Sequence, residues 1–370
     1  MVNDSARPSK AEKRKYDYHG EKIVTIWLKI IFASRLFLSG KLSVWKLINL
    51  IRVKVYYHLK LNKASPYPAL LVVEPTNNCQ LRCTKCRTLD NDIFDYAFES
   101  RPGSIPIGRL EFPVFQKAVD ALHKHLMIVV LYMQGEPFLS KDIHRMVQYC
   151  TDKNLATVVG TNGMLCGGEN ADKIAGSGLD ILKVAVSGFR QETYERYHKK
   201  GDIELIKKNL ADLSAARKRH GSSLIVHVEY IVFEYNGDEF REFKEYCEGL
   251  GVLCTSRADN WTYAGESETV NEGEGVWYSK RLCDWLWGVL ALNYDGTVIP
   301  CCVFSKTSEL KILGRVAPEK SIEDVQGIWN NSNFLDFRKE HLDGGRKGDP
   351  VCATCQLEGL GIQSVERELQ

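Results

Sequence analysis

The sequence predicts an α/β fold in which six parallel strands form an open or partial (β/α) barrel. Strand-like apolar runs alternate with helical segments between residues 70 and 258, and this alternation favours parallel strands joined by crossover helices. Polar and glycine-rich stretches follow successive strands, at 134–137, 161–163 and 187–188. Ligand sites of such folds lie at the carboxyl ends of the strands, so these stretches are expected to share one rim.

The individual elements follow from periodicity and from breaking residues. Pro66 and Pro68 interrupt the chain just before the aliphatic run 70–73, which is the first predicted strand. Five further runs are apolar and rich in β-branched residues: 127–134, 155–162, 180–188, 223–233 and 252–258. Helical periodicity occurs between these runs, at 113–125, 141–153, 202–220 and 238–250.

Composition and charge divide the chain into three parts. With 44% hydrophobic and 26% charged residues, the whole is typical of a globular protein. Residues 1–66 hold 14 Lys and Arg against four Asp and Glu, although the net charge of the chain is only +2. The partial barrel is expected at 67–262. A small cysteine-bearing module is expected at 263–370, entered through a polar, glycine-rich segment at 260–281.

The basic segment 1–66 is expected to form a tail and two amphipathic helices, at 23–40 and 43–61. Lys29 and Arg35 interrupt the first apolar run, which argues against a membrane-spanning helix. Both helices could pack on the main domain or lie on a bilayer. The charge asymmetry suggests an anionic partner such as a membrane surface, or else a solvated basic face. Nucleic acid is not expected, because the remainder of the chain is acidic.

Cys79, Cys83 and Cys86 form a C-x3-C-x2-C loop directly after the first predicted strand. The chain holds 12 cysteines in clusters and its start does not resemble a signal peptide. In a reducing cytoplasm, clustered cysteines favour metal binding or catalysis over disulfides. Three thiolates can hold three irons of a 4Fe–4S cluster and leave the fourth iron for a small molecule. A zinc site completed by a distant ligand is the alternative.

With the motifs that follow it on the rim, this loop resembles the radical S-adenosylmethionine (radical SAM) superfamily over residues 69–260. The resemblance implies that the fourth iron binds the amino and carboxylate groups of S-adenosylmethionine. Reductive cleavage then yields a 5′-deoxyadenosyl radical that abstracts hydrogen from a C–H bond. Lys85 stands where the family often has an aromatic residue near the adenine.

Four rim residues match positions that bind S-adenosylmethionine in the family. Gly135 and Glu136 resemble a Gly-Gly-Glu turn that binds the methionyl ammonium group, with Gln134 in place of the first glycine. Asn162 and Ser187 stand where the family places groups for the ribose and carboxylate. Turn capping is the alternative role for these last two residues.

The C-terminal cysteines resemble the auxiliary-cluster extension called SPASM in its long form and twitch in its short form. The long form has about seven cysteines for two clusters, whereas this chain has five from Cys283 onward. The resemblance therefore implies the short form, with one auxiliary 4Fe–4S cluster held by Cys283, Cys301, Cys352 and Cys355. Cys302 is then a spare thiol or an alternative to Cys301, and zinc is the alternative metal.

The sequence positions of three further cysteines predict their roles. Cys150 and Cys247 lie in the middle of predicted helices and are expected to be core thiols. Cys254 lies on the sixth predicted strand, where it could face the barrel and donate hydrogen to a product radical.

An auxiliary cluster suits a net oxidation, so we expect a radical SAM oxidoreductase that dehydrogenates an alcohol of a sugar-like or aminocyclitol substrate. The auxiliary cluster would accept the second electron. A small-molecule or carrier-linked saccharide and a flavodoxin- or ferredoxin-type electron donor are the expected partners. His227, Glu229 and Tyr230 on the fifth strand are candidate substrate groups, of which His227 and Glu229 share a face.

Three alternative functions stay open. A radical epimerase of a saccharide comes first and a peptide (RiPP) maturase second, although residues 1–66 lack the strand pattern of a winged leader-binding domain. A non-enzymatic metal-binding module for a polyanion comes third. The expected location is cytoplasmic, peripheral to a membrane if the N-terminal helices bind lipid.

Overall fold

The computed structural model describes residues 34, 36–84, 106–258, 282–304, 311–353 and 355. The chain divides into two compact units, Met1–Lys41 and Leu42–Gln370. All elements named below belong to the second unit. The expected linker at 260–281 and most of the expected helix at 23–40 lie outside the described residues.

Within the described residues, nine strands form one sheet in the order β6-β5-β4-β3-β2-β1-β7-β8-β9. The strands are β1 (Leu70–Val73), β2 (Ile128–Val130), β3 (Ala156–Thr161), β4 (Ile181–Val186), β5 (Ile225–Val232), β6 (Leu253–Ala258), β7 (Val289–Leu292), β8 (Thr297–Ile299) and β9 (Gly314–Arg315). Strands β1 to β6 are parallel neighbours in sequence order. The predicted α/β fold with a parallel, partial-barrel sheet is therefore confirmed.

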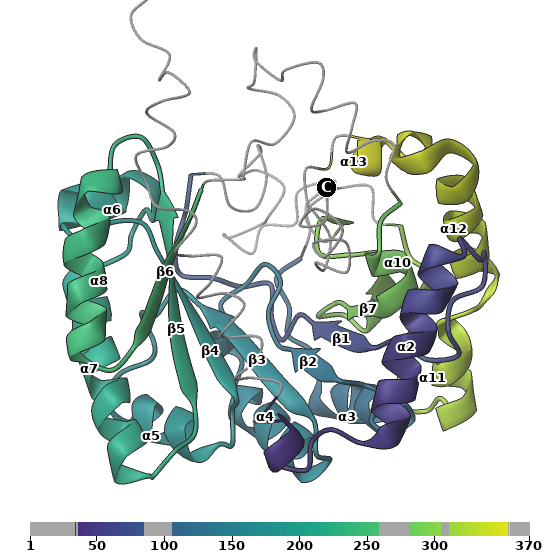
Figure 1. The fold of residues 1–370 in the computed structure, drawn as a ribbon, viewed down its shortest axis with the longest axis horizontal. Helices are drawn as coiled ribbons and strands as arrows, with labels where there is room; N and C mark the ends of the chain where they lie inside the picture. The colour runs from purple at the N-terminus through teal and green to yellow at the C-terminus, as the bar shows by residue number, and fades with distance from the viewer. Residues whose placement is uncertain are drawn as a thin grey trace, which may run out of the picture. The chain divides into compact units, whose positions relative to one another are not determined.

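Helices lie between the strands of the barrel, before β1 and after β9. They are α2 (Val44–His58), α3 (Phe112–Leu122), α4 (Ile143–Asp152), α5 (Glu169–Gly176), α6 (Gln191–Tyr197), α7 (Ile203–Arg219), α8 (Phe240–Gly249), α10 (Trp285–Gly288), α11 (Ile322–Ile328), α12 (Ser332–Gly344) and α13 (Pro350–Ala353), with 3-10 turns at η2 (Pro137–Leu139), η3 (Gly237–Glu239) and η5 (Gly345–Gly348). Figure 1 shows α3 to α8 along the outer side of strands β1 to β6.

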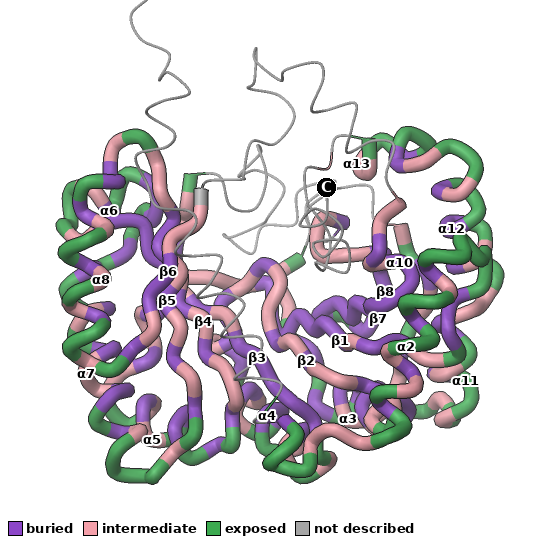
Figure 2. The backbone as a smooth tube through the Cα atoms, in the orientation of Figure 1, coloured by how far each residue is buried: buried purple, intermediate pink, exposed green. Residues whose placement is uncertain are grey.

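The two faces of the sheet differ in burial. In β4, Leu182, Val184 and Val186 are buried in the apolar core, and the residues between them are half-buried. Strand β5 alternates in the same way over its first six residues. Because side chains alternate across a strand, the buried set packs toward the helices and the half-buried set lines the inner face of the barrel. Figure 2 shows this mixture of buried and half-buried positions along the strands.

The C-terminal region continues the same sheet, which the sequence did not predict. Strand β7 pairs in parallel with β1, so that Leu71 lies between Val129 of β2 and Leu290 of β7. Strands β8 and β9 then run antiparallel. The β7–β8 turn contains Gly296 at φ +82°, a left-handed conformation that glycine adopts readily. The domain boundaries at 66 and 262 stay predictions.

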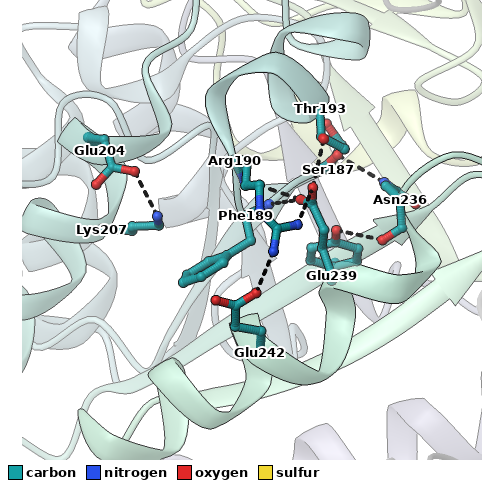
Figure 3. A network of polar contacts seen from close by, with 10 residues as sticks. Ser187, Phe189, Arg190, Thr193, Glu204, Lys207, Asn236, Glu239 and Glu242 are labelled. Atoms are coloured by element: carbon teal, nitrogen blue, oxygen red, sulfur yellow. Dashed lines mark hydrogen bonds and ion pairs between the residues drawn. The ribbon is translucent and has the colours of Figure 1, made fainter.

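Glu239 fixes the turn that follows β4. Its carboxylate accepts hydrogen bonds from the N–H groups of Phe189 and Arg190, from the Arg190 guanidinium and from the Thr193 hydroxyl, at 2.6–3.2 Å. Asn236 donates to the carbonyl oxygen of Ser187 at 2.9 Å. Figure 3 shows these contacts reaching the turn from the β5–α8 connection. The rim residue Ser187 is therefore held by a neighbouring connection.

Replacing Glu239 with Gln is expected to lower the free energy of unfolding by about 1–3 kcal/mol at pH 7, because charge-assisted hydrogen bonds are lost. Burial alone would raise the pKa of Glu239, but its hydrogen bonds outweigh burial and hold the pKa below its ordinary value. The ionised form therefore stabilises the fold above about pH 4.5, and this contribution is lost as the pH falls. Urea unfolding at several pH values measures the difference.

Glu242→Gln is the matched control. Glu242 pairs with the same Arg190 at 2.9 Å, but its side chain is 53% exposed. Loss of this ion pair is expected to lower the free energy of unfolding by less than about 0.5 kcal/mol. Equal destabilisation by the two substitutions would contradict the role given to Glu239.

Candidate functional site

The first cysteine loop begins at the carboxyl end of β1, as predicted. Cys79 and Cys83 are half-buried on this loop. Cys86 and Lys85 lie outside the described residues, so the third expected thiolate and the departure at Lys85 stay sequence predictions.

The cysteine loop is attached to the connection after α6. The N–H of Arg82 donates to the carbonyl oxygen of Lys199 at 3.0 Å, and the N–H of Thr84 donates to that of Tyr197 at 3.1 Å. These two bonds flank Cys83. The rim of β1 and the rim of β4 are therefore joined through backbone groups, without dependence on side-chain identity.

Glu74 joins the end of β1 to the turn after β2. This carboxylate is completely buried, and it accepts hydrogen bonds from the N–H groups of Gln134 at 2.5 Å and Gly135 at 3.3 Å. The N–H of Glu74 itself donates to the carbonyl oxygen of Leu292 in β7. Sequence analysis missed this residue. An acidic residue directly after a buried strand was the available signal.

Gly135 allows this turn to touch the segment that leads into the cysteine loop. A Cβ at this position would overlap the carbonyl oxygen of Thr76 and lie 2.7 Å from that of Asn78. The next residue, Glu136, donates its N–H to the carbonyl oxygen of Asn78 at 2.7 Å. The predicted Gly-Glu turn is therefore in direct backbone contact with the residues just before Cys79.

The Glu136 carboxyl group is buried and already bonded within the protein. It accepts from the Thr161 hydroxyl at 2.8 Å, the Asn162 N–H at 2.9 Å and the Phe138 N–H at 3.2 Å. Burial raises the pKa of Glu136 to about 7, against the lowering effect of these bonds. The group thus joins the β2 turn to the end of β3. A contact with the methionyl ammonium stays a prediction.

Asn162 lies beside the cysteine loop. Its Nδ2 is 3.7 Å from Cys79 Sγ, within hydrogen-bond range of sulfur. Its Oδ1 accepts from Gln80 Nε2 at 3.2 Å and from the Met164 N–H at 3.0 Å. The geometry places this amide against a predicted cluster ligand. The ribose contact implied by the family stays a prediction.

Ser187 is fully buried, and its hydroxyl contacts a histidine that sequence analysis did not single out. Ser187 Oγ is 2.6 Å from His198 Nδ1. Burial, with a smaller contribution from Arg257, lowers the pKa of His198 to about 3, so the imidazole is neutral at pH 7. The hydroxyl is engaged inside the fold, and its predicted contact with the cofactor carboxylate is untested.

Tyr194 contributes a buried hydroxyl within electrostatic reach of the first cysteines. Its ring stacks on that of His198 with centroids 4.7 Å apart. Among the described residues its Oη has no hydrogen-bond partner. Burial, followed by negative charge on Cys83 and Cys79, raises the Tyr194 pKa. A buried donor of this kind calls for an acceptor, and the sulfur atoms of an iron–sulfur cluster would supply one. The described residues therefore fit the implied group.

The C-terminal cysteines gather from three segments. Burial raises the pKa of Cys283 to about 12, and negative charge on Cys355 adds to this effect. Burial likewise raises the pKa of Cys301, followed by charge on Cys302, Cys283 and Cys355. For Cys352, the charges of Cys283 and Cys355 again raise the pKa after burial and Asp349. These mutual effects require that the thiols lie near one another.

Four thiolates are the usual ligand set of a 4Fe–4S cluster, and the assignment of Cys283, Cys301, Cys352 and Cys355 to one cluster stays a prediction. Arg346 is a buried cation near these thiols, and its charge opposes the burial that raises the pKa of Cys283 and Cys352. In the described part of the chain, no three His, Cys, Asp or Glu side chains converge on a single metal ion.

Gln134 connects the two cysteine sites. Its Nε2 donates to the carbonyl oxygen of Cys302 at 3.0 Å, and the side chain is buried. This residue stands where the family turn has a glycine. The departure from the family pattern therefore places a hydrogen bond between the β2 turn and the C-terminal cysteines.

The inner face of the barrel carries a charged network on β4, β5 and β6. Lys183 Nζ is 2.6 Å from Glu229 Oε1, and Arg257 Nε is 3.7 Å from Glu229 Oε2. His227 Nε2 is 2.8 Å from Thr255 Oγ1. Burial alone would disfavour the charged form of both groups. The interaction with the opposite charge nevertheless helps to raise the pKa of Lys183 and lowers the pKa of Glu229, so both side chains are ionised. The predicted common face of His227 and Glu229 is thus the inner one.

Two sequence expectations for the barrel interior are wrong. Tyr230 faces the helices, where its hydroxyl donates to the carbonyl oxygen of Asn236 at 2.9 Å and its ring packs on Phe243. Cys254 is paired with Val228 and lies in the apolar core. Both errors have one cause, because strand alternation fixes relative faces but not which face is inside. Cys150 and Cys247 are core thiols, as predicted.

Comparisons with known proteins agree with this geometry. The model of the radical SAM superfamily matches residues 73–247, and that of the SPASM iron–sulfur cluster-binding domain matches residues 283–356. The AdoMet-dependent heme synthase of Methanosarcina barkeri is 25% identical over 186 residues, which cover 50% of this chain and 49% of that protein. The chain thus spans about half the length of that relative.

A second relative is matched over most of its length. The tungsten-containing aldehyde ferredoxin oxidoreductase cofactor-modifying protein of Pyrococcus furiosus is 25% identical over 332 residues, covering 78% of this chain and 87% of that protein. The solved structure of Streptococcus suis SuiB bound to S-adenosylmethionine has the same fold, with a TM-score of 0.55, 13% identity and coverage of 84% and 76%. The chain therefore belongs to the radical SAM superfamily and carries a SPASM iron–sulfur cluster-binding domain.

Proposed function

We propose that this enzyme oxidises a secondary alcohol of a sugar-like or aminocyclitol substrate to a ketone. When bound, the first cluster and S-adenosylmethionine supply a carbon radical that takes one hydrogen atom, and the auxiliary cluster accepts one electron. The hydroxyl proton passes to a basic group of the inner face. The substrate thus loses two hydrogens, and one S-adenosylmethionine gives methionine and 5′-deoxyadenosine.

The observation that carries this proposal is the direct link between two cysteine sites in one sheet. The Gln134–Cys302 hydrogen bond joins the turn beside the first loop to the C-terminal cysteines. A nearby second cluster suits a reaction that must remove an electron after the hydrogen atom. The cluster with an open iron would be held by Cys79, Cys83 and Cys86, and a single auxiliary cluster by Cys283, Cys301, Cys352 and Cys355.

S-adenosylmethionine would lie over the rim between these sites. Gly135 and Glu136 would shape the contact for its methionyl end, with Asn162 and Ser187 at the ends of β3 and β4. A reaction on a polar substrate is supported by the inner-face network, since ionised side chains in a partly closed barrel suit hydroxyl and amino groups better than an apolar ligand. Membership of the superfamily sets aside the non-enzymatic module.

An external flavodoxin- or ferredoxin-type donor would supply the electron that starts each turnover. The substrate would be free or linked to a carrier. We place the enzyme in the cytoplasm, with its basic N-terminal segment against a membrane surface. Within the described residues, no helix is both long and apolar enough to cross a bilayer.

A panel of substrates tests the reaction. The reconstituted enzyme is incubated without oxygen with S-adenosylmethionine, reductant and sugars, aminocyclitols or carrier-linked saccharides in D2O. We expect 5′-deoxyadenosine to form in proportion to a product that has lost two hydrogens. A product of unchanged oxidation state that gains deuterium at carbon identifies an epimerase. Turnover with peptides alone identifies a peptide maturase, and either result replaces the proposal.

Iron content tests the two ligand sets. The unaltered chain is expected to bind about eight irons, and Cys352→Ala about four, because one auxiliary thiolate is lost. Cys352→Ala should still cleave S-adenosylmethionine, whereas Cys83→Ala should not. Cys302→Ala is the neighbouring control and should keep about eight irons. Zinc together with only four irons in the unaltered chain would refute the auxiliary cluster.

Substituting Lys183 tests the inner face. Lys183→Met leaves Glu229 without its closest cation, so substrate-dependent turnover is expected to fall by about tenfold or more. Cleavage of S-adenosylmethionine without substrate should persist. Lys208→Met is the matched control, because its 2.7 Å pair with Asp212 lies on the outer helix α7. Steady-state assays, together with thermal melts of the same variants, separate a loss of turnover from a loss of stability. Equal turnover by Lys183→Met and Lys208→Met would contradict a role of the inner face in substrate binding.

A further inference from the structure

Helix α2 turns two polar side chains, Lys46 and Asn49, toward the protein. Lys46 Nζ donates to the carbonyl oxygen of Asn154 at 2.6 Å. Asn49 Nδ2 donates to the carbonyl oxygens of Pro68 at 3.0 Å and His125 at 3.1 Å. Both side chains are buried. A surface helix ordinarily keeps such polar side chains in water, whereas α2 buries Lys46 and Asn49 beside Val53 and Tyr57.

The opposite side of α2 is apolar and exposed. Val44, Ile51 and Leu59 are 69%, 62% and 64% exposed. At about 100° per residue these positions fall on one side of the helix. The exposed apolar residues of the helix and of its C-cap, here called the α2 apolar face, are Val44, Trp45, Leu47, Ile51, Val55 and the C-cap Leu59. Figure 2 shows exposed and buried positions alternating along this helix.

Basic residues border the α2 apolar face. On the helical projection Lys54 lies at one edge of the face and Arg52 lies next to Trp45 near the other, with His58 between Leu47 and Ile51; all three polar residues are exposed. Burial and the positive charges of Arg52 and Lys124 lower the pKa of His125, which places Lys124 in the same neighbourhood. The sequence from 41 to 73 contains six Lys and Arg and no Asp or Glu. An apolar strip with a basic border is the pattern of a helix that lies in a membrane interface.

We propose that the α2 apolar face docks on the surface of a bilayer that contains anionic lipids. Trp45 and the aliphatic side chains would enter the interface while Arg52 and Lys54 contact the headgroups. A second copy of the chain is disfavoured, because it would bring two basic borders together.

This inference extends the membrane contact proposed above and is independent of the reaction. Full-length enzyme is floated with vesicles of phosphatidylcholine alone or of phosphatidylcholine with phosphatidylglycerol. We expect at least about tenfold tighter binding to the anionic vesicles, since each basic residue near such a surface contributes about 1 kcal/mol. Ile51→Glu should weaken binding by about tenfold or more. Arg52→Gln should weaken binding to the anionic vesicles only.

Leu205→Glu is the control, because Leu205 is also an exposed apolar residue but lies on α7. This variant should bind vesicles like the unaltered chain. Equal binding by Ile51→Glu and Leu205→Glu, or no binding by the unaltered chain, overturns the proposal. A dimer in light scattering that Ile51→Glu converts to monomer also overturns it, in favour of a second copy. Vesicle binding is measured without substrate, so its failure leaves S-adenosylmethionine cleavage and the proposed reaction unaffected.

Discussion

The site depends on one close approach of backbone to backbone, at Gly135. Any side chain there would overlap the Thr76 carbonyl oxygen, so only glycine lets the turn after β2 reach the segment that carries Cys79. The buried Glu74 carboxylate holds the same turn from the other side through the N–H groups of Gln134 and Gly135. Because an unpaired buried carboxylate is costly, this turn and the end of β1 are fixed together. The direction of the cysteine loop follows from that pair of constraints.

The same strand end also positions the second cysteine set. Strand β7 pairs with β1 on the side opposite β2, and the β7–β8 hairpin then leads to Cys301 and Cys302. Gln134 closes this arrangement, because its side chain reaches the Cys302 carbonyl oxygen across the end of β1. Two regions that are separate in sequence thus share one sheet and one rim.

Much of this could be predicted from sequence because it is local. The six parallel strands, the cysteine loop after β1 and the glycine turn after β2 all follow from short patterns. What was missed depends on long-range partners. Glu74 acts through residues 60 positions away, Gln134 through one 168 positions away, and no periodicity encodes such pairs. Tyr230 and Cys254 were assigned to the wrong face because strand alternation is compatible with either face lying inside the barrel. Only the packing of the helices decides which face is buried against them.

Helix α2 carries the proposed membrane contact and also holds the segment that leads into the auxiliary site. Its buried face includes Tyr57, whose hydroxyl donates to the carbonyl oxygen of Leu282 at 3.2 Å, directly before Cys283. Asn49 on the same face bonds to Pro68, just before β1. Polar groups of α2 are needed inside because these carbonyl oxygens must be paired, and six apolar residues in and directly after the helix stay exposed. The polar contacts on the inner side of α2 therefore hold both cysteine-bearing segments, and a bilayer is the solvent that its exposed apolar face suits.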